Sequence, residues 1–118
     1  MRSDQAMTVP SLSERPEHTM IIVTGHVLAR RDTESEVQRL SVEHVLRSRS
    51  EPGCVSYEVS RDVQQPLRFV FMERWSDWDA LQAHFTLQSS RDFAQSMAGL
   101  CEGRPHVAIY RAQAMGPR

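Results

Sequence analysis

The chain has 118 residues, of which 40% are hydrophobic, and a formal net charge of −1, values typical of one small globular domain. Acidic and basic residues are interspersed, so no field of one sign favours binding to nucleic acid or to an anionic membrane. The sequence contains no lysine, which excludes Schiff-base chemistry and a lysine acid or base.

The two ends of the chain are expected to lie outside the domain. Residues 1–19 are rich in Ser, Pro, Glu and Asp, which predicts a flexible arm, and residues 114–118 form a short tail, leaving a domain at 20–113. The longest apolar runs are far shorter than the roughly 20 residues of a membrane span. An apolar leader segment is also missing, so we expect a cytoplasmic protein in which Cys54 and Cys101 are reduced thiols.

The first predicted elements are a strand at residues 20–29 and a helix that follows it. Apolar residues fall on both faces of the strand, which is typical of an inner strand of a sheet. Thr33 and Glu36 have the spacing of a capping box, and apolar residues then repeat at helical spacing up to about residue 49.

A β-hairpin is predicted next, with strands at residues 54–62 and 67–75. Pro52 and Gly53 suit the second and third positions of a type II turn, which ends the helix and leads directly into the hairpin. Aromatic and β-branched residues are dense in the second strand. One face of the hairpin is expected to carry Tyr57, Phe69, Phe71 and Trp75.

Two further helices and a last strand complete the chain. A variant capping box at Ser76–Asp79 predicts a helix at about residues 77–85. A helix after Ser89, a break at residues 103–105 and a strand at 107–112 follow. The first of these helices is expected to bury Trp78, Leu81 and Phe85.

The order βαββααβ predicts an α+β fold of the ferredoxin-like type, with one antiparallel sheet and the helices on a single face. The other face would carry Val70 and Met72, with Ile21 and Val23 as further candidates. Such a face is too apolar to remain in water. Two sheets packed face to face would bury it, so we expect a symmetric homodimer.

The sequence contains few motifs for catalysis or metal binding. Its five histidines and two cysteines do not have metal-ligand spacing, and neither a glycine-rich phosphate loop nor a serine-nucleophile motif is present. We therefore expect no metal and no cofactor, and the remaining candidate site is an aromatic cavity with a few polar groups.

Trp75 and His84 are the first candidates for this cavity, because Trp75 ends a strand on its helix-facing side and His84 lies beside the buried face of the next helix. The alternatives without a catalytic role are a tryptophan packed in the core and a hydrogen-bonded histidine at the surface. His26 is unusual inside an apolar inner strand. For His44 the sequence leaves two roles open, lining a pocket and packing in the core.

The chain resembles the antibiotic biosynthesis monooxygenase domain family over roughly residues 20–112, through the segments E-P-G-C-V-S-Y-E-V, L-R-F-V-F-M-E-R-W-S-D-W-D-A-L-Q-A-H-F and S-R-D-F. The resemblance implies a dimeric ferredoxin-like α/β barrel, and the family includes cofactor-independent oxygenases that convert polyketide phenols or hydroquinones to quinones. Related haem-degrading members use an Asn on the first strand, a Trp ending the third strand and a His on the next helix. Trp75 and His84 match the last two, and His26 stands in place of the Asn.

We therefore predict a cofactor-independent monooxygenase whose partners are a small aromatic substrate and O2. A deprotonated electron-rich phenol can reduce O2 itself, so the protein needs a base, a hydrogen-bond donor and a dry pocket. The candidate catalytic residues are His84 as the base, Trp75, whose indole N–H would hold the substrate oxyanion, and His26 as the alternative base. The candidate walls are Tyr57, Phe69, Phe71, Phe85 and His44.

Two other functions fit the same fold. One is a non-catalytic dimer that binds a small molecule, and the other is a haem-binding or haem-degrading enzyme. Oxygen consumption by the metal-free protein separates the first from a monooxygenase, and a haem titration tests the second.

Overall fold

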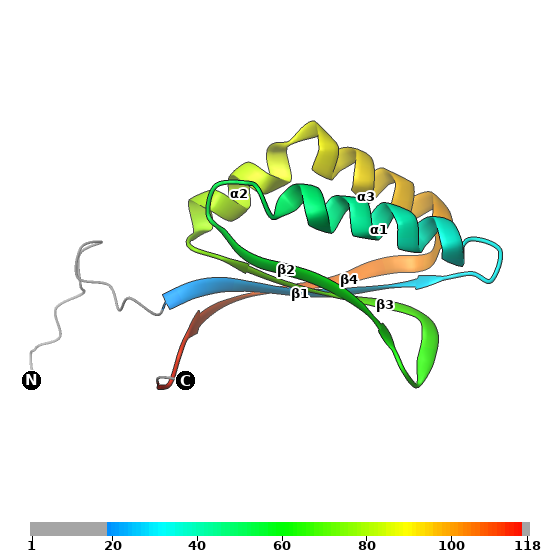
Figure 1. Cartoon of the computed structure of the whole chain (residues 1–118), viewed down its shortest axis with the longest axis horizontal. Helices are drawn as coiled ribbons and strands as arrows, with labels where there is room; N and C mark the ends of the chain where they lie inside the picture. Colours follow the sequence, from blue (N-terminus) through cyan, green and yellow to red (C-terminus); the bar gives the residue numbers. More distant parts are fainter. Residues whose placement is uncertain (1–18, 117–118) are drawn as a thin grey trace, which may run out of the picture.

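The computed structural model describes residues 19–116, which form a sheet of four antiparallel strands covered on one face by three helices (Figure 1). The order of the strands in the sheet is β2-β3-β1-β4. This arrangement confirms the predicted βαββααβ fold and the inner position of the first strand. The elements are β1 (Thr19–Ala29), α1 (Glu34–Ser48), β2 (Cys54–Asp62), β3 (Gln65–Trp75), α2 (Trp78–Thr86), α3 (Gln88–Leu100) and β4 (Cys101–Gln113).

The boundaries predicted for the arm and the tail stay predictions. Residues 1–18 and 117–118 lie outside the described range, while Thr19, placed in the arm, is the first residue of β1. Both cysteines, half-buried Cys54 and buried Cys101, are free. Between residues 19 and 116, no helix has the length and apolar character needed to cross a membrane.

The core lies between the sheet and the helices. Ile21 and Val23 are buried on the helix side, where they pair across the sheet with Trp75 and Glu73 of β3. The suggestion that these two residues add to the open face is therefore wrong. Because side chains alternate along a strand, Ile22 lies on that face instead.

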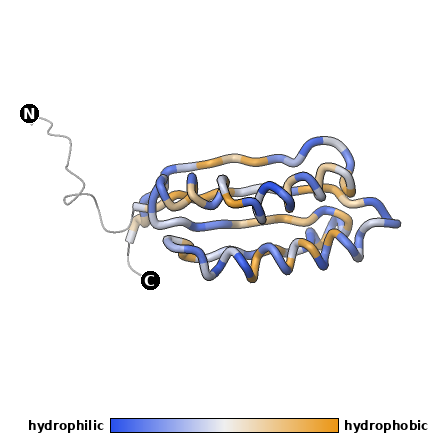
Figure 2. The backbone as a smooth tube through the Cα atoms, turned by 90° about the horizontal axis from the view of Figure 1, so that it is seen from above, coloured by the Kyte–Doolittle hydropathy of each residue, from blue (hydrophilic) through white to orange (hydrophobic). Residues whose placement is uncertain are grey.

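The helices alternate between hydrophilic and hydrophobic residues along their length (Figure 2). The beginning of α1 differs from the predicted capping box. The hydroxyl of Thr33 donates a hydrogen bond to the carbonyl of Leu100 at 2.8 Å, and Glu36 instead binds the guanidinium of Arg39 at 2.7 Å. Thr33 thus ties the beginning of α1 to the end of α3.

α2 turns a different face to the core than its hydrophobic pattern predicts. Leu81 is fully buried and His84 is 3% exposed, whereas Trp78 and Phe85 are 44% and 41% exposed. Residues three apart lie on one face of a helix, so Leu81 and His84 form the buried stripe. The prediction missed this stripe because a histidine does not count as hydrophobic.

The end of the chain also differs from its predicted bounds. α3 begins at Gln88, before the predicted start, and β4 begins at Cys101 and continues through the predicted break at residues 103–105. Gly103 adopts a φ of 65°, and the β1–β4 register shifts just after His26. The irregular segment is therefore accommodated inside a paired strand, in the manner of a β-bulge.

The turn between α1 and β2 has the predicted geometry. Gly53 has a φ of 81°, and the N–H of Cys54 donates to the carbonyl of Glu51 at 3.1 Å. The carbonyl of Gly53 accepts from the N–H of Ser76 at 2.8 Å, and a Cβ added to Gly53 would lie 2.4 Å from the Cβ of Ala80. The turn is therefore packed against the beginning of α2, which holds Glu51 in place.

Candidate functional site

A cavity of about 180 Å³ lies between the sheet and the helices. Its walls are mostly apolar and aromatic, and they include Phe71 of β3 and Phe93 of α3. All four strands and all three helices within the described range contribute to it. The titratable side chains that border the cavity are His26, His44, Tyr57, Glu73, His84 and His106.

His84 is buried, borders this cavity and is paired with a carboxylate. Its Nδ1 lies 2.7 Å from Oε1 of Glu51, with Oγ of Ser90 at 3.4 Å from the same nitrogen. An ionised carboxylate only accepts hydrogen bonds, so we assign the proton of the neutral ring to Nδ1. Nε2 then keeps a lone pair, as a general base requires. The sequence pointed to His84 but not to Glu51, which looked like part of the turn.

His44 is the second imidazole of the cavity, and its surroundings keep it neutral. It is 2% exposed, its ring stacks on Phe93 with 4.0 Å between centroids, and Nδ1 accepts from the guanidinium of Arg47 at 3.0 Å. Burial above all, then the nearby charges of His84 and Arg47, lower the pKa of His44 to about 3. His44 is therefore suited to lining the pocket and not to taking a proton near neutral pH.

Trp75 meets His84 as predicted, with 4.7 Å between the ring centroids. The indole is fully buried, however, and is not among the residues that border the cavity. Its N–H donates to Oε1 of Glu73 at 2.9 Å, so this N–H is already bound and does not take the predicted contact with a substrate oxyanion. The side chain that faces the cavity at this point is Glu73.

Glu73 was not predicted as a site residue, because it lies in a strand dense in aromatic and β-branched residues that was assigned to the core. The alternation of β3 places Glu73 and Trp75 on the same face, and this is the signal that identifies it. Burial raises the pKa of Glu73, while the hydrogen bond from Trp75 and the proximity of His84 oppose this rise. Glu73 lies opposite Tyr57 of β2 in the sheet, and burial, followed by the proximity of Glu73, raises the pKa of Tyr57.

Two of the predicted site residues lie away from His84. His26 pairs with Val70, on the sheet face turned away from the helices, and stacks on His106 at the cavity edge with 4.9 Å between centroids. Phe69 is buried under the guanidinium of Arg61, 4.5 Å from its ring centroid, and does not border the cavity. The other predicted wall residues do border it, and they are Tyr57, Phe71, Phe85 and His44.

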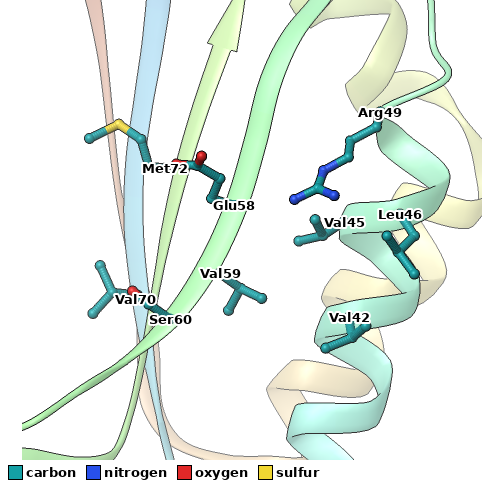
Figure 3. Close-up of a pocket in the computed structure, with 9 residues that line it drawn as sticks. All are labelled: Val42, Val45, Leu46, Arg49, Glu58, Val59, Ser60, Val70 and Met72. Carbon is teal, nitrogen blue, oxygen red and sulfur yellow. The ribbon is translucent and has the colours of Figure 1, made fainter.

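A larger hollow of about 560 Å³ lies between α1 and the edge strand β2 (Figure 3). Aliphatic side chains dominate it, and its charged groups are Arg49 and Glu58. The imidazoles and the buried carboxyl of Glu73 border the smaller cavity, which we therefore take as the candidate site. Among residues 19–116, His, Cys, Asp and Glu side chains form no group of three or more that is placed to hold a metal ion.

Known proteins resemble the chain in both sequence and structure. Residues 20–96 match the family model described as antibiotic biosynthesis monooxygenase. An uncharacterized protein of Synechocystis sp. is 32% identical over 104 residues, which are 86% of this chain and 71% of the relative. A Deinococcus radiodurans structure, assigned to the antibiotic biosynthesis monooxygenases without an established activity, has a TM-score of 0.79 at 26% identity, covering 84% of this chain and 99% of that one. Another structure, described as an antibiotic biosynthesis monooxygenase, has a TM-score of 0.74 at 25% identity, covering 80% and 100%.

Proposed function

Because this chain belongs to the antibiotic biosynthesis monooxygenase family, we propose that it is a cofactor-independent monooxygenase that uses O2 to oxidise an electron-rich phenol or hydroquinone to a quinone. The observation that carries the proposal is the largely buried Glu51–His84 pair, whose imidazole borders an aromatic cavity. The hydrogen bond to Glu51 orients the ring and stabilises the imidazolium that forms when Nε2 takes the hydroxyl proton of the substrate.

The cavity supports the later steps by its shape and its walls. The phenolate transfers electrons to O2, and the apolar walls keep water away from the oxygenated intermediate. The volume of about 180 Å³ is below the roughly 300–1,000 Å³ of pockets for drug-sized ligands. This size favours a substrate with few rings over a group as large as haem.

Oxygen consumption tests the proposal directly. Purified, metal-free protein is supplied with a panel of dihydroxynaphthalenes and anthrones, and O2 uptake is recorded together with quinone absorbance. We expect uptake with at least one member, in step with quinone formation. If the compounds bind but none causes O2 uptake, the proposal is contradicted and a non-catalytic binding protein is favoured. A Soret band on haem titration would favour a haem-binding or haem-degrading enzyme.

We also propose that the protein forms a homodimer through the sheet face that the helices leave open (Figure 1). Val59 of β2 is directed toward α1, whereas Val70 and Met72 of β3 are directed away from it (Figure 3). An apolar surface of this kind is stabilised by packing against a second copy. The cytoplasmic location stays a prediction from the sequence.

Met72→Glu is expected to convert the dimer to a monomer, because the interface would have to bury an unpaired carboxylate. Sedimentation velocity at micromolar concentration measures the change. Val63→Glu is the matched control, since Val63 is 94% exposed in the hairpin loop and the variant should remain dimeric. A wild-type protein that sediments as a monomer at this concentration would show that the open face has no such role.

A further inference from the structure

The proposed reaction leaves the carboxyl of Glu73 without a role. Glu73 is 7% exposed and borders the cavity that contains His84. We propose that Glu73 is a further catalytic residue, which keeps its proton and donates a hydrogen bond to the substrate oxygen that His84 deprotonates. The inference rests on the proposed function, because it assumes that a phenolic oxygen lies at His84.

The hydrogen bond from Trp75 determines which oxygen of Glu73 can donate. The indole N–H donates to Oε1 at 2.9 Å, so Oε1 acts as the acceptor oxygen of a protonated carboxyl. A carboxylic acid has one O–H donor, which Oε2 then carries. Trp75 is fully buried and does not border the cavity. It therefore fixes the orientation of the Glu73 carboxyl without contacting the substrate.

The groups that face Glu73 act on its proton in both directions. Burial, the largest effect, and the carboxylate of Glu51 from the turn favour the protonated form, whereas the indole N–H of Trp75, His84 from α2 and the hydroxyl of Tyr57 from β2 favour the ionised form. Cys54 from β2 also lies near Glu73. Within residues 19–116, Glu73 forms no salt bridge with an arginine. Taking a carboxylate out of water without a cation is costly, and the nearby carboxylate of Glu51 adds repulsion. A neutral Glu73 beside a neutral His84 avoids both costs.

His84 and Glu73 then act on the same substrate oxygen in different ways. The hydroxyl proton passes to Nε2 of His84, and the electrons of the O–H bond stay on the phenolate oxygen. The O–H of Glu73 donates to this oxygen and retains its own proton. Donors that are already oriented toward a developing negative charge, in a site with little water, are among the most effective catalytic groups.

Glu73→Gln and Glu73→Leu separate this role from that of a second base. The glutamine keeps an acceptor for Trp75 and an N–H donor for the substrate, so its turnover should stay within about tenfold of the wild type. The leucine has no donor, and its turnover should fall by about 10² to 10³. A glutamine variant as impaired as the leucine variant would overturn the proposal. Glu43→Gln, at an exposed position of α1, is the control.

Two measurements test the role of Glu73 without using turnover. Infrared spectra at neutral pH should show a protonated carboxyl band that Glu73→Gln removes and Glu43→Gln retains. The anion of p-nitrophenol, followed by its absorbance, should bind about tenfold more weakly to Glu73→Leu than to Glu73→Gln. The absence of the band, or equal binding by the two variants, overturns the inference even in an active enzyme. The band and the binding difference in a protein that oxidises no phenol would uphold Glu73 and reject the proposed function.

Discussion

Replacing His84 with alanine is expected to lower phenol turnover by ~10² to 10⁴, because general-base catalysis contributes about this much. The change removes the imidazole whose Nδ1 is held 2.7 Å from Glu51. Since His84 is 3% exposed, the substitution also leaves a cavity and an unpaired carboxylate, so the variant must first be shown to be folded by its unfolding curve. His84→Gln, which fills more of the space, should lose a similar share of activity.

The dependence of turnover on pH identifies the histidine that acts as the base. A base is active in its deprotonated form, so the wild-type rate should rise with pH on the acidic side. This limb should vanish in His84→Ala and persist in His26→Ala, because the His26 ring stacks on His106, whereas the carboxylate of Glu51 orients His84. The opposite result would identify His26 as the base. Full activity in both variants would mean that solvent or the substrate itself takes the proton.

Gly53→Ala is expected to lower the free energy of unfolding by about 2 to 5 kcal/mol, as measured by urea denaturation. The φ of 81° costs an L-residue roughly 1–2 kcal/mol, and a methyl group 2.4 Å from the Cβ of Ala80 adds an overpacking cost of roughly 1–3 kcal/mol. Because Glu51 precedes this turn, the relief of the clash should also displace its carboxylate from His84.

Gly99→Ala is the matched control for this substitution. Gly99 lies in α3, and an added Cβ meets nothing within 4 Å. The alanine should therefore raise the free energy of unfolding by about 0.5–1 kcal/mol, because glycine is a poor helix residue. If the two alanine variants were equally stable, the turn would not be the constraint that its geometry indicates.

The fold was predictable because its signals are local. The periods of the apolar residues distinguish helices from strands, and Pro52 and Gly53 mark the turn between α1 and β2. The boundaries of β4 were not predictable from the sequence. A glycine and a proline indicate a break there, but the strand passes through both residues with its register shifted. Pairing with β1 outweighs the local propensity there.

The site was only partly predictable, because its polar contacts join distant parts of the chain. The meeting of Trp75 and His84 follows from the end of a strand and the buried face of the helix after it. The contact between His84 and Glu51 spans 33 residues and leaves no periodic pattern in the sequence. The bond from Trp75 to Glu73 is short-range, yet the sequence did not indicate that the carboxyl of Glu73 accepts the indole N–H.

The strand order β2-β3-β1-β4 has a consequence for how the protein folds. β1 pairs on one side with β3 and on the other with β4, so the first and last strands of the described chain are neighbours. During synthesis the outer edge of β1 stays unpaired until β4 has emerged, and contacts between distant segments form slowly. An open strand edge is a template for pairing with another chain. The interval between the emergence of α3 and the closure of β4 onto β1 is therefore when the nascent chain is most exposed to aggregation.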